Sequence, residues 1–590
     1  MSIAGSSTKP SADPREIDGP DAAYTKLLHV FAATWSKEFT THRRIVSSHR
    51  RDGITHMIAL SRWVVAFILV SVAAIAQSSA MSFRFPETGQ SASDQAVLLA
   101  IDRVSWPVQG GLGLFLSKPH VRREPVLTPS RDNPRAPDNV ATHHYGTVLL
   151  DEGKFRMWYY PVRTTETPSR LNQGPICYAE SIDGLTWTKP VLRQVEVKGS
   201  RENNAIALPA DVIEGVQVIK DLKDPDPQRR YKMVFNPSHP DLVYSLRTAT
   251  SPDGLNWTAG PQTPIGSFLE IASLYQHNGL FMVNSQIWGR TEGGRAEGRQ
   301  AYVWVSPNFD TWLQEPAASF ALPEPATGSG YFGKYPQVHL GVAGVSLGNV
   351  VIGLYGLWHE RGWGENGTTC DFGLVLSHNG IHFHEPVRGH IFLSHLDSPV
   401  TPVPGKQYPT ILTQSNSILN YGDETRIYHG RWRNAGYVAG ERPDYWGECA
   451  LATLPRDRWG ALALLPKVTE GFRLPTQVRA TEATIDGTVW SMPIQLPEAA
   501  ETEIWINADA ADQMSVEIAD ERFNLMPDYS GARAGRSKTA GGLDCRIEWP
   551  RKDLGALKGK TVRLRLRLVK ESPEEPKFYA MYLRTPAKRR

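Results

Sequence analysis

The strongest constraint on this chain is a short pattern that recurs five times along its middle. Each copy begins with Ser or Thr, continues through a turn that contains Asp or Asn, and ends in an aromatic residue. The copies occupy residues 181–187, 251–257, 306–312, 377–383 and 453–459, of which the third and the fifth are the loosest. Because their aromatic residues lie 55 to 76 residues apart, one structural unit of that size is expected to repeat.

Each copy follows a segment rich in β-forming residues, with a second hairpin pattern upstream. In the first unit, residues 145–150 and 154–160 flank Asp151-Glu152-Gly153, which is a hairpin signature. Each unit is therefore predicted to hold four short antiparallel strands, with the repeated turn between the third and the fourth. Repeated sheets of this kind are the blades of β-propellers. We predict an all-β fold with a five-bladed β-propeller over residues 137–466, and a set of stacked sandwiches is the alternative.

Two segments flank the predicted propeller. Residues 81–136 are expected to complete its last blade or to cap its rim. Beyond the propeller, alternating apolar and polar residues indicate half-exposed antiparallel strands. These strands are predicted at 502–507, 514–518, 561–568 and 577–583. A C-terminal β-sandwich over residues 468–590 follows from them.

The N-terminal part predicts export. Residues 57–80 combine one basic residue, an apolar run from Trp63 to Ala76 and small residues at the end, which is typical of a signal peptide. We therefore expect Met57 to be the functional start, residues 1–56 to be an extension without a fold, and the body to be secreted or periplasmic. An N-terminal membrane anchor is the alternative. Four scattered cysteines fit either two disulfides or buried thiols.

Two stretches of the repeats resemble a known group of enzymes. Residues 178–190 and 270–283 are similar to blade segments of the five-bladed propeller glycoside hydrolases, the invertase-like and arabinanase- or xylosidase-like superfamily. The resemblance implies a distant member, a propeller with a trailing β-sandwich, and hydrolysis of O-glycosyl bonds. The Asn-Asp-Pro-Asn, Arg-Asp-Pro and Glu-Cys-Pro motifs of the invertase-like enzymes are absent. The architecture therefore transfers better than the catalytic residues.

Propeller sites lie at one end of the central channel. Two loops of each blade reach that end: the loop that enters the innermost strand and the loop that joins the second strand to the third. Glycoside hydrolysis needs two carboxyl groups, one protonated and one acting as base or nucleophile. The carboxyl groups at these positions give four catalytic candidates, in order of preference Glu270, Asp371, Asp138 and Glu202. Each of them could instead be an ordinary loop carboxylate or turn residue.

The same loops contain aromatic, histidine and arginine side chains that suit sugar recognition. The predicted substrate-binding residues are His143, His144, Tyr335, His339, Trp363, Arg431, Trp432 and Trp446. Because neighbouring strand residues point to opposite faces, only one residue of the pair His143 and His144 can face the channel. No metal site and no cofactor are predicted. Whether a structural cation lies in the channel is left undecided.

The sequence thus predicts an exported glycoside hydrolase that acts on a poly- or oligosaccharide. A non-catalytic glycan-binding propeller is the first alternative. A sialidase-like enzyme, with Arg163, Arg290 and Arg431 converging on a carboxylate, is the second. A lyase using His144 and Tyr145 is the third. The formal charge of +3 argues against a nucleic-acid partner, and the oligomeric state is left undecided.

Overall fold

The computed structural model describes only part of the chain, all of it within the unit Gln77–Arg590. The described residues are 80–164, 175–210, 213–237, 245–261, 265, 270–294, 297–323, 337–359, 368–434, 444–465, 486–551 and 553–586. Most of the signal-peptide prediction, the N-terminal extension, Tyr335 and Trp363 lie outside them. None of the helices in the described part is long and apolar enough to cross a membrane.

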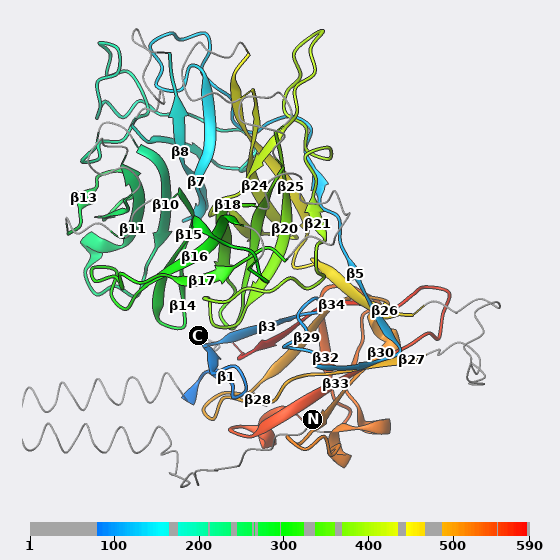
Figure 1. The fold of residues 1–590 in the computed structure, drawn as a ribbon. Helices are drawn as coiled ribbons and strands as arrows, with labels where there is room; N and C mark the ends of the chain where they lie inside the picture. Colours follow the sequence, from blue (N-terminus) through cyan, green and yellow to red (C-terminus); the bar gives the residue numbers. More distant parts are fainter. Residues whose placement is uncertain are drawn as a thin grey trace, which may run out of the picture. The chain divides into compact units, whose positions relative to one another are not determined.

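The described chain is nearly all β and forms several antiparallel sheets (Figure 1). Between residues 141 and 455 the strands follow one another in five groups. The first group is β7 (Ala141–Asp151), β8 (Lys154–Val162) and β9 (Cys177–Ser181). The second is β10 (Ile213–Lys220), β11 (Tyr231–Pro237), β12 (Arg247–Ser251) and β13 (Thr258–Ala259). The third is β14 (Glu270–His277), β15 (Leu280–Arg290), β16 (Glu297–Ser306) and β17 (Ala317–Phe320).

The fourth and fifth groups are joined by one parallel pair of residues, Cys370 and Ile411. The fourth is β18 (Gln337–Ser346), β19 (Val351–His359), β20 (Thr369–Ser377) and β21 (Ile391–Leu393). The fifth is β22 (Ile411–Thr413), β23 (Ile418–Tyr421), β24 (Glu424–Arg433) and β25 (Trp446–Pro455). Its outer strand is β6 (His120–Val121), which comes from the N-terminal side and pairs with β25.

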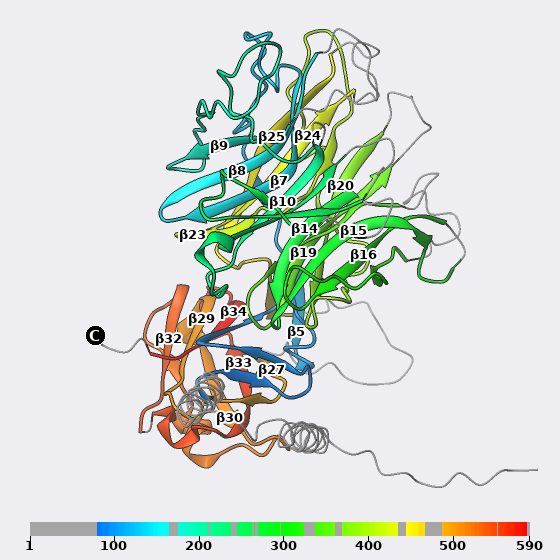
Figure 2. The same ribbon diagram turned by 90° about the vertical axis from the view of Figure 1, so that its left-hand side faces the viewer.

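The five groups contact one another in cyclic order. Strand β7 packs against β10, β10 against β14, and β14 against β18. Figure 2 shows β7, β10 and β14 side by side. After the link from β20 to β22, strands β24 and β25 pack against β7. The first strands of the first four groups therefore lie together at the centre of this arrangement.

The repeated turns are built as hydrogen-bonded loops. In the first copy, the Asp183 carboxylate accepts hydrogen bonds from the backbone N–H groups of Leu185 and Thr186, both at 2.8 Å. The Trp187 indole donates to the carbonyl of Gly184 at 3.1 Å, and Trp257 does the same to Gly254. These contacts explain the spacing of the pattern, because each partner lies within three residues of the other.

The turns also tie neighbouring groups together. The carbonyl of Gly254 accepts a hydrogen bond from the indole of Trp158 in the first group, at 2.9 Å. The carbonyl of Gly184 accepts one from the Tyr428 hydroxyl of the fifth group, also at 2.9 Å. The bond from Tyr428 to Gly184 joins the fifth group to the first, as expected if the groups follow one another in a closed ring.

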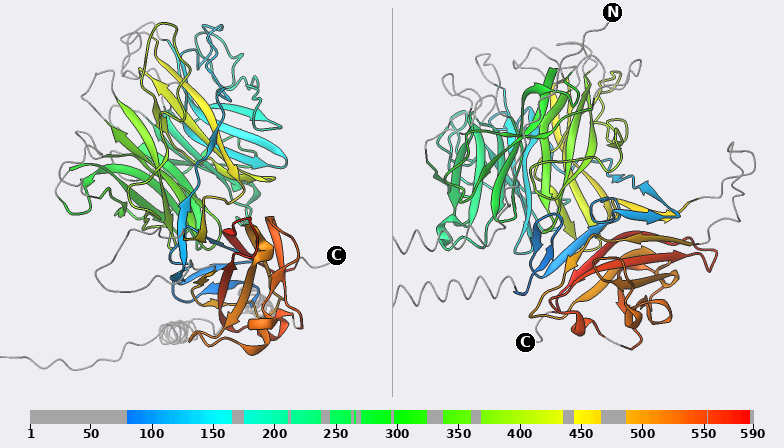
Figure 3. Two further views of the ribbon diagram at one scale, coloured as in Figure 1. Left: turned by 90° about the vertical axis from the view of Figure 1, so that its right-hand side faces the viewer. Right: turned by 60° about the horizontal axis from the view of Figure 1, so that its bottom comes forward.

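The segment expected to complete or cap the propeller divides between two partners. Only β6 joins the fifth group. The strands β1 (Phe83–Phe85), β3 (Gln95–Leu99), β4 (Val108–Gly110) and β5 (Leu112–Leu116) pair instead with strands from residues 460–584, and β2 (Gln90–Ala92) pairs with β1. Their partners are β28 (Ile494–Gln495), β34 (Lys577–Arg584), β27 (Asp486–Trp490) and β26 (Gly460–Leu464). Figure 3 shows these blue strands among the orange and red ones.

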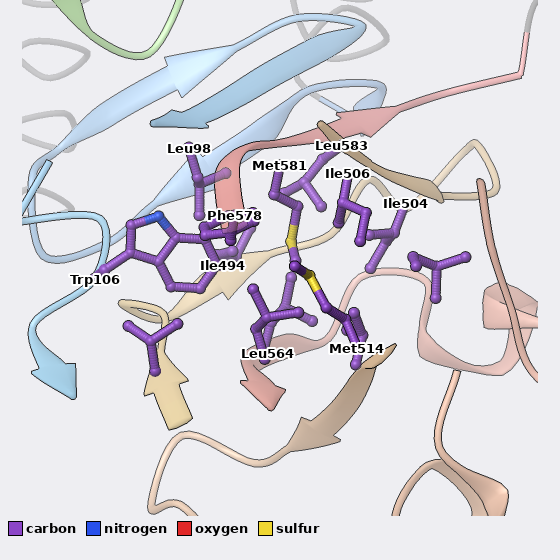
Figure 4. Packing of buried hydrophobic residues seen from close by; sticks show 14 of the residues in the cluster. Leu98, Trp106, Ile494, Ile504, Ile506, Met514, Leu564, Phe578, Met581 and Leu583 are labelled. Carbon is purple, nitrogen blue, oxygen red and sulfur yellow. The ribbon is translucent and has the colours of Figure 1, made fainter. Parts of the chain in front are cut away.

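Two sheets enclose the largest apolar core of this C-terminal region. Besides the strands above, they contain β29 (Glu503–Asp509), β30 (Met514–Ala519), β31 (Arg536–Ser537), β32 (Gly542–Glu548) and β33 (Thr561–Val569). Leu98 and Trp106 from the N-terminal segment pack with Ile506, Phe578 and Met581 (Figure 4). Because both segments supply this core, it could not be assigned to residues 468–590 alone.

The four cysteines are buried and unpaired, so the structure has thiols rather than disulfides at Cys177, Cys370, Cys449 and Cys545.

Candidate active site

The innermost strands are irregular where they begin. Pairing registers shift between His143 and Thr147 in β7 and between Ile213 and Gly215 in β10. Similar shifts occur near the starts of β14 and β18. Such bulges re-aim side chains and are frequent beside active sites. At Gly146 an added Cβ would lie 1.8 Å from the Trp158 carbonyl oxygen, so the bulge in β7 requires glycine there.

Two carboxyl groups meet at these strand starts. Glu214 occupies the bulge of β10, and Glu270 is the first residue of β14. Their side chains are hydrogen-bonded to each other, and both residues are half-buried. Burial is the main cause that raises both pKa values, and the nearby charge of Glu270 raises the pKa of Glu214 further. The pair therefore favours holding one proton.

The surroundings of Glu270 decide where that proton sits. The Leu340 backbone N–H donates to Gln286 Oε1 at 2.6 Å, so the amide nitrogen of Gln286 must face the other way. It donates to Glu270 Oε2. Arg299 Nη1 lies 3.8 Å from the same oxygen. A donor and a cation favour the ionised form of Glu270, which leaves the proton on Glu214.

Aromatic and histidine rings lie next to this pair. The Tyr145 hydroxyl and His339 Nε2 are 3.2 Å apart, and Tyr145 lies within electrostatic reach of both glutamates. The His143 ring meets Trp432 edge-on at 4.0 Å, and His339 packs on Trp358 at 4.5 Å. Burial lowers the pKa of His143 to about 3 and that of His339 well below its usual value. Both imidazoles are therefore neutral near pH 7.

Other predicted substrate-binding residues have partners inside the sheets. The Arg431 guanidinium is buried and donates to Ser398 Oγ and to the carbonyls of Arg122 and Arg123. His144 Nε2 is 2.7 Å from Ser417 Oγ. The indole of Trp446 donates to Glu448 at 2.6 Å. Arg290 pairs with Glu297 at the surface, whereas Arg431 is buried with its donors bound inside the protein, so these two guanidinium groups are not placed to bind one substrate carboxylate as a sialidase-like site needs.

The other three catalytic candidates are engaged in local contacts. Asp138 accepts from the Tyr159 hydroxyl and lies 2.6 Å from Lys189 Nζ. Asp371 accepts from the backbone N–H of His395 and contacts the rings of His359 and His395. These hydrogen bonds hold the pKa of Asp371 well below its usual value against the effect of burial. Glu202 is exposed and pairs with Arg193. Of the four, Glu270 is the one that faces a second carboxyl group.

Glu214 was not among the residues predicted from the sequence. The second innermost strand was expected to begin near Glu202, whereas β10 begins at Ile213. The signal was available, because Glu214 opens an apolar alternating segment, as Glu270 does. The intervening residues 203–210 form no named strand and lie against the first group instead, where Ala205 forms a β-bridge with Cys177 and the Asn204 amide donates to the carbonyl of Tyr178 at 2.7 Å.

The described residues offer no cluster of three or more His, Cys, Asp or Glu side chains that could hold a metal ion. A cavity of about 550 Å³ lies at the opposite end of the innermost strands, lined in part by Leu150, Lys220, Gln276 and Asn416. Neither glutamate of the pair lines it, so this cavity is separate from the candidate site.

Comparisons with known proteins find similarity in structure only. No protein-family model matches the chain, and no curated protein matches it in sequence. A glycosyl hydrolase from Bacteroides ovatus is 15% identical with a TM-score of 0.35, and the match covers 59% of this chain and 94% of that one.

Two further solved structures are similar at 12% identity. The first is described under the GH130 family of mannoside phosphorylases, which contains hydrolases for β-1,2 mannosidic linkages in Candida mannan. It has a TM-score of 0.37 and covers 58% of this chain and 94% of its own. The second is the catalytic domain of a GH62 α-L-arabinofuranosidase from Coprinopsis cinerea. Its TM-score is 0.35, and the match covers 58% of this chain and 97% of that one.

Proposed function

We propose that this protein is an exported glycoside hydrolase, built on a five-bladed β-propeller with a C-terminal β-sandwich, that cleaves glycosidic bonds of a poly- or oligosaccharide. The observation that carries the proposal is the contact of two carboxyl groups of raised pKa, Glu214 and Glu270, beside aromatic rings. The cyclic order of the five strand groups supports the propeller. Export rests on the sequence of residues 57–80.

In this proposal Glu214 is the general acid. Its pKa is raised by burial and by the neighbouring carboxylate, so it keeps its proton near neutral pH. It gives that proton to the oxygen of the leaving sugar as the glycosidic bond breaks. The proton that Glu214 now donates to Glu270 in their hydrogen bond would thus be given to the substrate oxygen instead.

Glu270 is then the base or nucleophile. Arg299 and Gln286 stabilise its negative charge, and Gln286 is itself fixed by the backbone of Leu340. As base, Glu270 takes a proton from the water that attacks the anomeric carbon. As nucleophile, it bonds to that carbon first and water releases the sugar afterwards.

One observation favours the non-catalytic alternative. The two carboxyl groups are in direct hydrogen-bond contact, whereas the separation is about 5 Å in retaining glycosidases and about 6.5–9.5 Å in inverting ones. A substrate oxygen must therefore separate the pair before catalysis. Glutamate has three rotatable bonds, and both residues are half-buried, so side-chain rotation is the expected route. A pair that stays closed would bind glycans without cleaving them.

Release of reducing ends from a panel of plant, fungal and algal oligosaccharides tests the proposal. The Glu214→Gln and Glu270→Gln variants should each lose about 10²- to 10⁴-fold in kcat. Glu202→Gln, the same change at an exposed glutamate, should keep full activity. Proton NMR of the first anomer released then shows retention or inversion. Binding without cleavage by the unaltered protein would favour the glycan-binding alternative, whereas full activity in both variants would mean that the catalytic groups lie elsewhere.

The same assay can test the proton assignment through pH. Activity should rise as Glu270 ionises and fall as Glu214 loses its proton, and both pKa values are raised. Gln286→Leu removes a donor to Glu270, so its pKa should rise further and the rising limb should move to higher pH. If only the falling limb of the pH profile moved, Glu270 would be the general acid and Glu214 the base or nucleophile.

A further inference from the structure

Trp288 is exposed to a degree that is unusual for tryptophan. Its exposed fraction is 66%, whereas Trp158, Trp304 and Trp459 are buried. No ring, cation or hydrogen-bonding group of the described residues contacts its indole. Burial of such a side chain against a ligand would contribute about 1.5–3 kcal/mol. Trp288 is therefore a candidate for contact with a bound ligand.

The strand pairing places Trp288 beside the carboxyl pair. The register of β15 with β16 is regular from Gln286 to Arg290, with Trp288 opposite Arg299. Directly opposite residues share a face, and so do residues two apart on one strand. Trp288 thus shares a face with Gln286, which donates to Glu270, and with Arg299, which lies 3.8 Å from Glu270. Two residues along a strand span about 7 Å.

The backbone under Trp288 is firmly packed. An added Cβ at the next residue, Gly289, would lie 2.7 Å from the Tyr302 hydroxyl. Arg299 is held in place by its hydrogen bond to Gln337 at 2.7 Å and by the Trp358 ring, 4.9 Å away. The indole therefore stands on a rigid base next to a fixed cation.

The surroundings of Trp288 suit a sugar ring better than a protein surface. Further along β15, Arg290 forms an exposed ion pair with Glu297. On strands β14 to β17, Trp288 is the only strongly exposed large apolar residue. Protein interfaces use contiguous apolar patches, whereas a single planar ring with polar neighbours suits the C–H face of one pyranose.

We propose that Trp288 is a stacking platform for a second sugar ring, next to the ring whose bond is cleaved at Glu214 and Glu270. The substrate is then a chain of at least two sugars, and Trp288 selects for chain length. This inference rests on the proposed function.

Calorimetric binding in an inactive background tests the platform. The full chain carrying Glu270→Gln is screened on a glycan microarray, and the best-bound tetrasaccharide and its constituent monosaccharide become the probes. Adding Trp288→Ala should weaken tetrasaccharide binding about tenfold, which is about 1.4 kcal/mol, and leave monosaccharide binding unchanged. Trp288→Phe should restore most of the affinity. Ile182→Ala, at an exposed apolar residue of the turn 181–187, should change neither.

The outcomes separate the two proposals. Unchanged tetrasaccharide binding by Trp288→Ala, or equal weakening for both probes, overturns the platform and leaves the hydrolase intact. If sedimentation shows that Trp288→Ala abolishes self-association while glycan binding is unchanged, the occupant is a second copy and the inference is wrong. If the protein binds no glycan on the array and cleaves none in solution, the proposed function fails and the platform fails with it.

Discussion

The two ends of the strand groups are built on opposite principles. At the turn end, where the repeated turns lie, backbone N–H groups and carbonyls are matched within a few residues, as at Asp183 and Gly184. At the other end, where β10 and β14 begin, two carboxyl groups of raised pKa face each other. One end stabilises the fold, and the other holds groups that destabilise it. Sites of this second kind are where function is expected.

The largest expected effect on stability is at the turn end. Gly254 has a φ of +76°, and an added Cβ would lie 3.0 Å from the Trp158 ring. Gly254→Ala should cost about 1–2 kcal/mol for the left-handed backbone and about 1–3 kcal/mol for crowding. Denaturant unfolding measures this, and the specific activity of the folded variant should not change.

Gly279→Ala is the matched control for that variant. Gly279 has a φ of +77° with no atom within 4 Å of an added Cβ, so only the backbone cost applies. Equal destabilisation by both variants would mean that the contact between the turn and the neighbouring sheet contributes nothing.

At the other end, removing a charge should stabilise the protein. The pKa of Glu214 is raised in the folded state, so the folded protein binds this proton more tightly than the unfolded chain. Stability is therefore lost as pH rises from the ordinary glutamate pKa through the raised value. Glu214→Gln cannot ionise, and it should be more stable than the unaltered protein at pH 9 by about 1–2 kcal/mol. At pH 4 the two should be alike, as urea unfolding at both pH values would show.

Asp371→Asn should show the opposite sign. The pKa of Asp371 is lowered by hydrogen bonds from His359 and His395, so its charge stabilises the fold above the ordinary aspartate pKa. Its replacement should destabilise the protein at neutral pH by about 1–3 kcal/mol. A gain of stability in both variants would indicate a general effect of charge removal rather than the distinction drawn between the two sites.

The same contrast explains what the sequence could predict. The repeated turns were readable because the hydrogen-bond partners of the Asp183 carboxylate and of the Trp187 indole lie within three residues. Glu270 was found because it opens an apolar strand. The pairing of β6 with β25, and of β3 with β34, depends on contacts between residues more than 300 positions apart, and no local pattern encodes such contacts. The contact of Glu214 with Glu270 likewise needs two neighbouring sheets to meet.

The smallest expected effect is that of the turn carboxylate. Backbone hydrogen bonds from Thr186 and Leu185 lower the pKa of Asp183 to about 2. Its stabilisation is therefore present above the ordinary aspartate pKa and is lost as pH falls toward 2. Because the side chain is exposed to solvent, Asp183→Ala should cost only about 0.5–1 kcal/mol at pH 7 and less at pH 2, where the protonated group keeps an acceptor oxygen but has lost its charge.

The third copy of the turn provides the control for that pH dependence. Asn308 Oδ1 accepts the equivalent backbone bonds, from Asp310 and Thr311 at 3.0 and 2.8 Å, without a titrating group. Asn308→Ala should therefore lose a similar amount of stability at both pH values, as urea unfolding can measure. If Asp183→Ala also proved independent of pH, the turn would be held by acceptor geometry alone. The charge of aspartate would then add nothing to a turn in which two of the copies use asparagine.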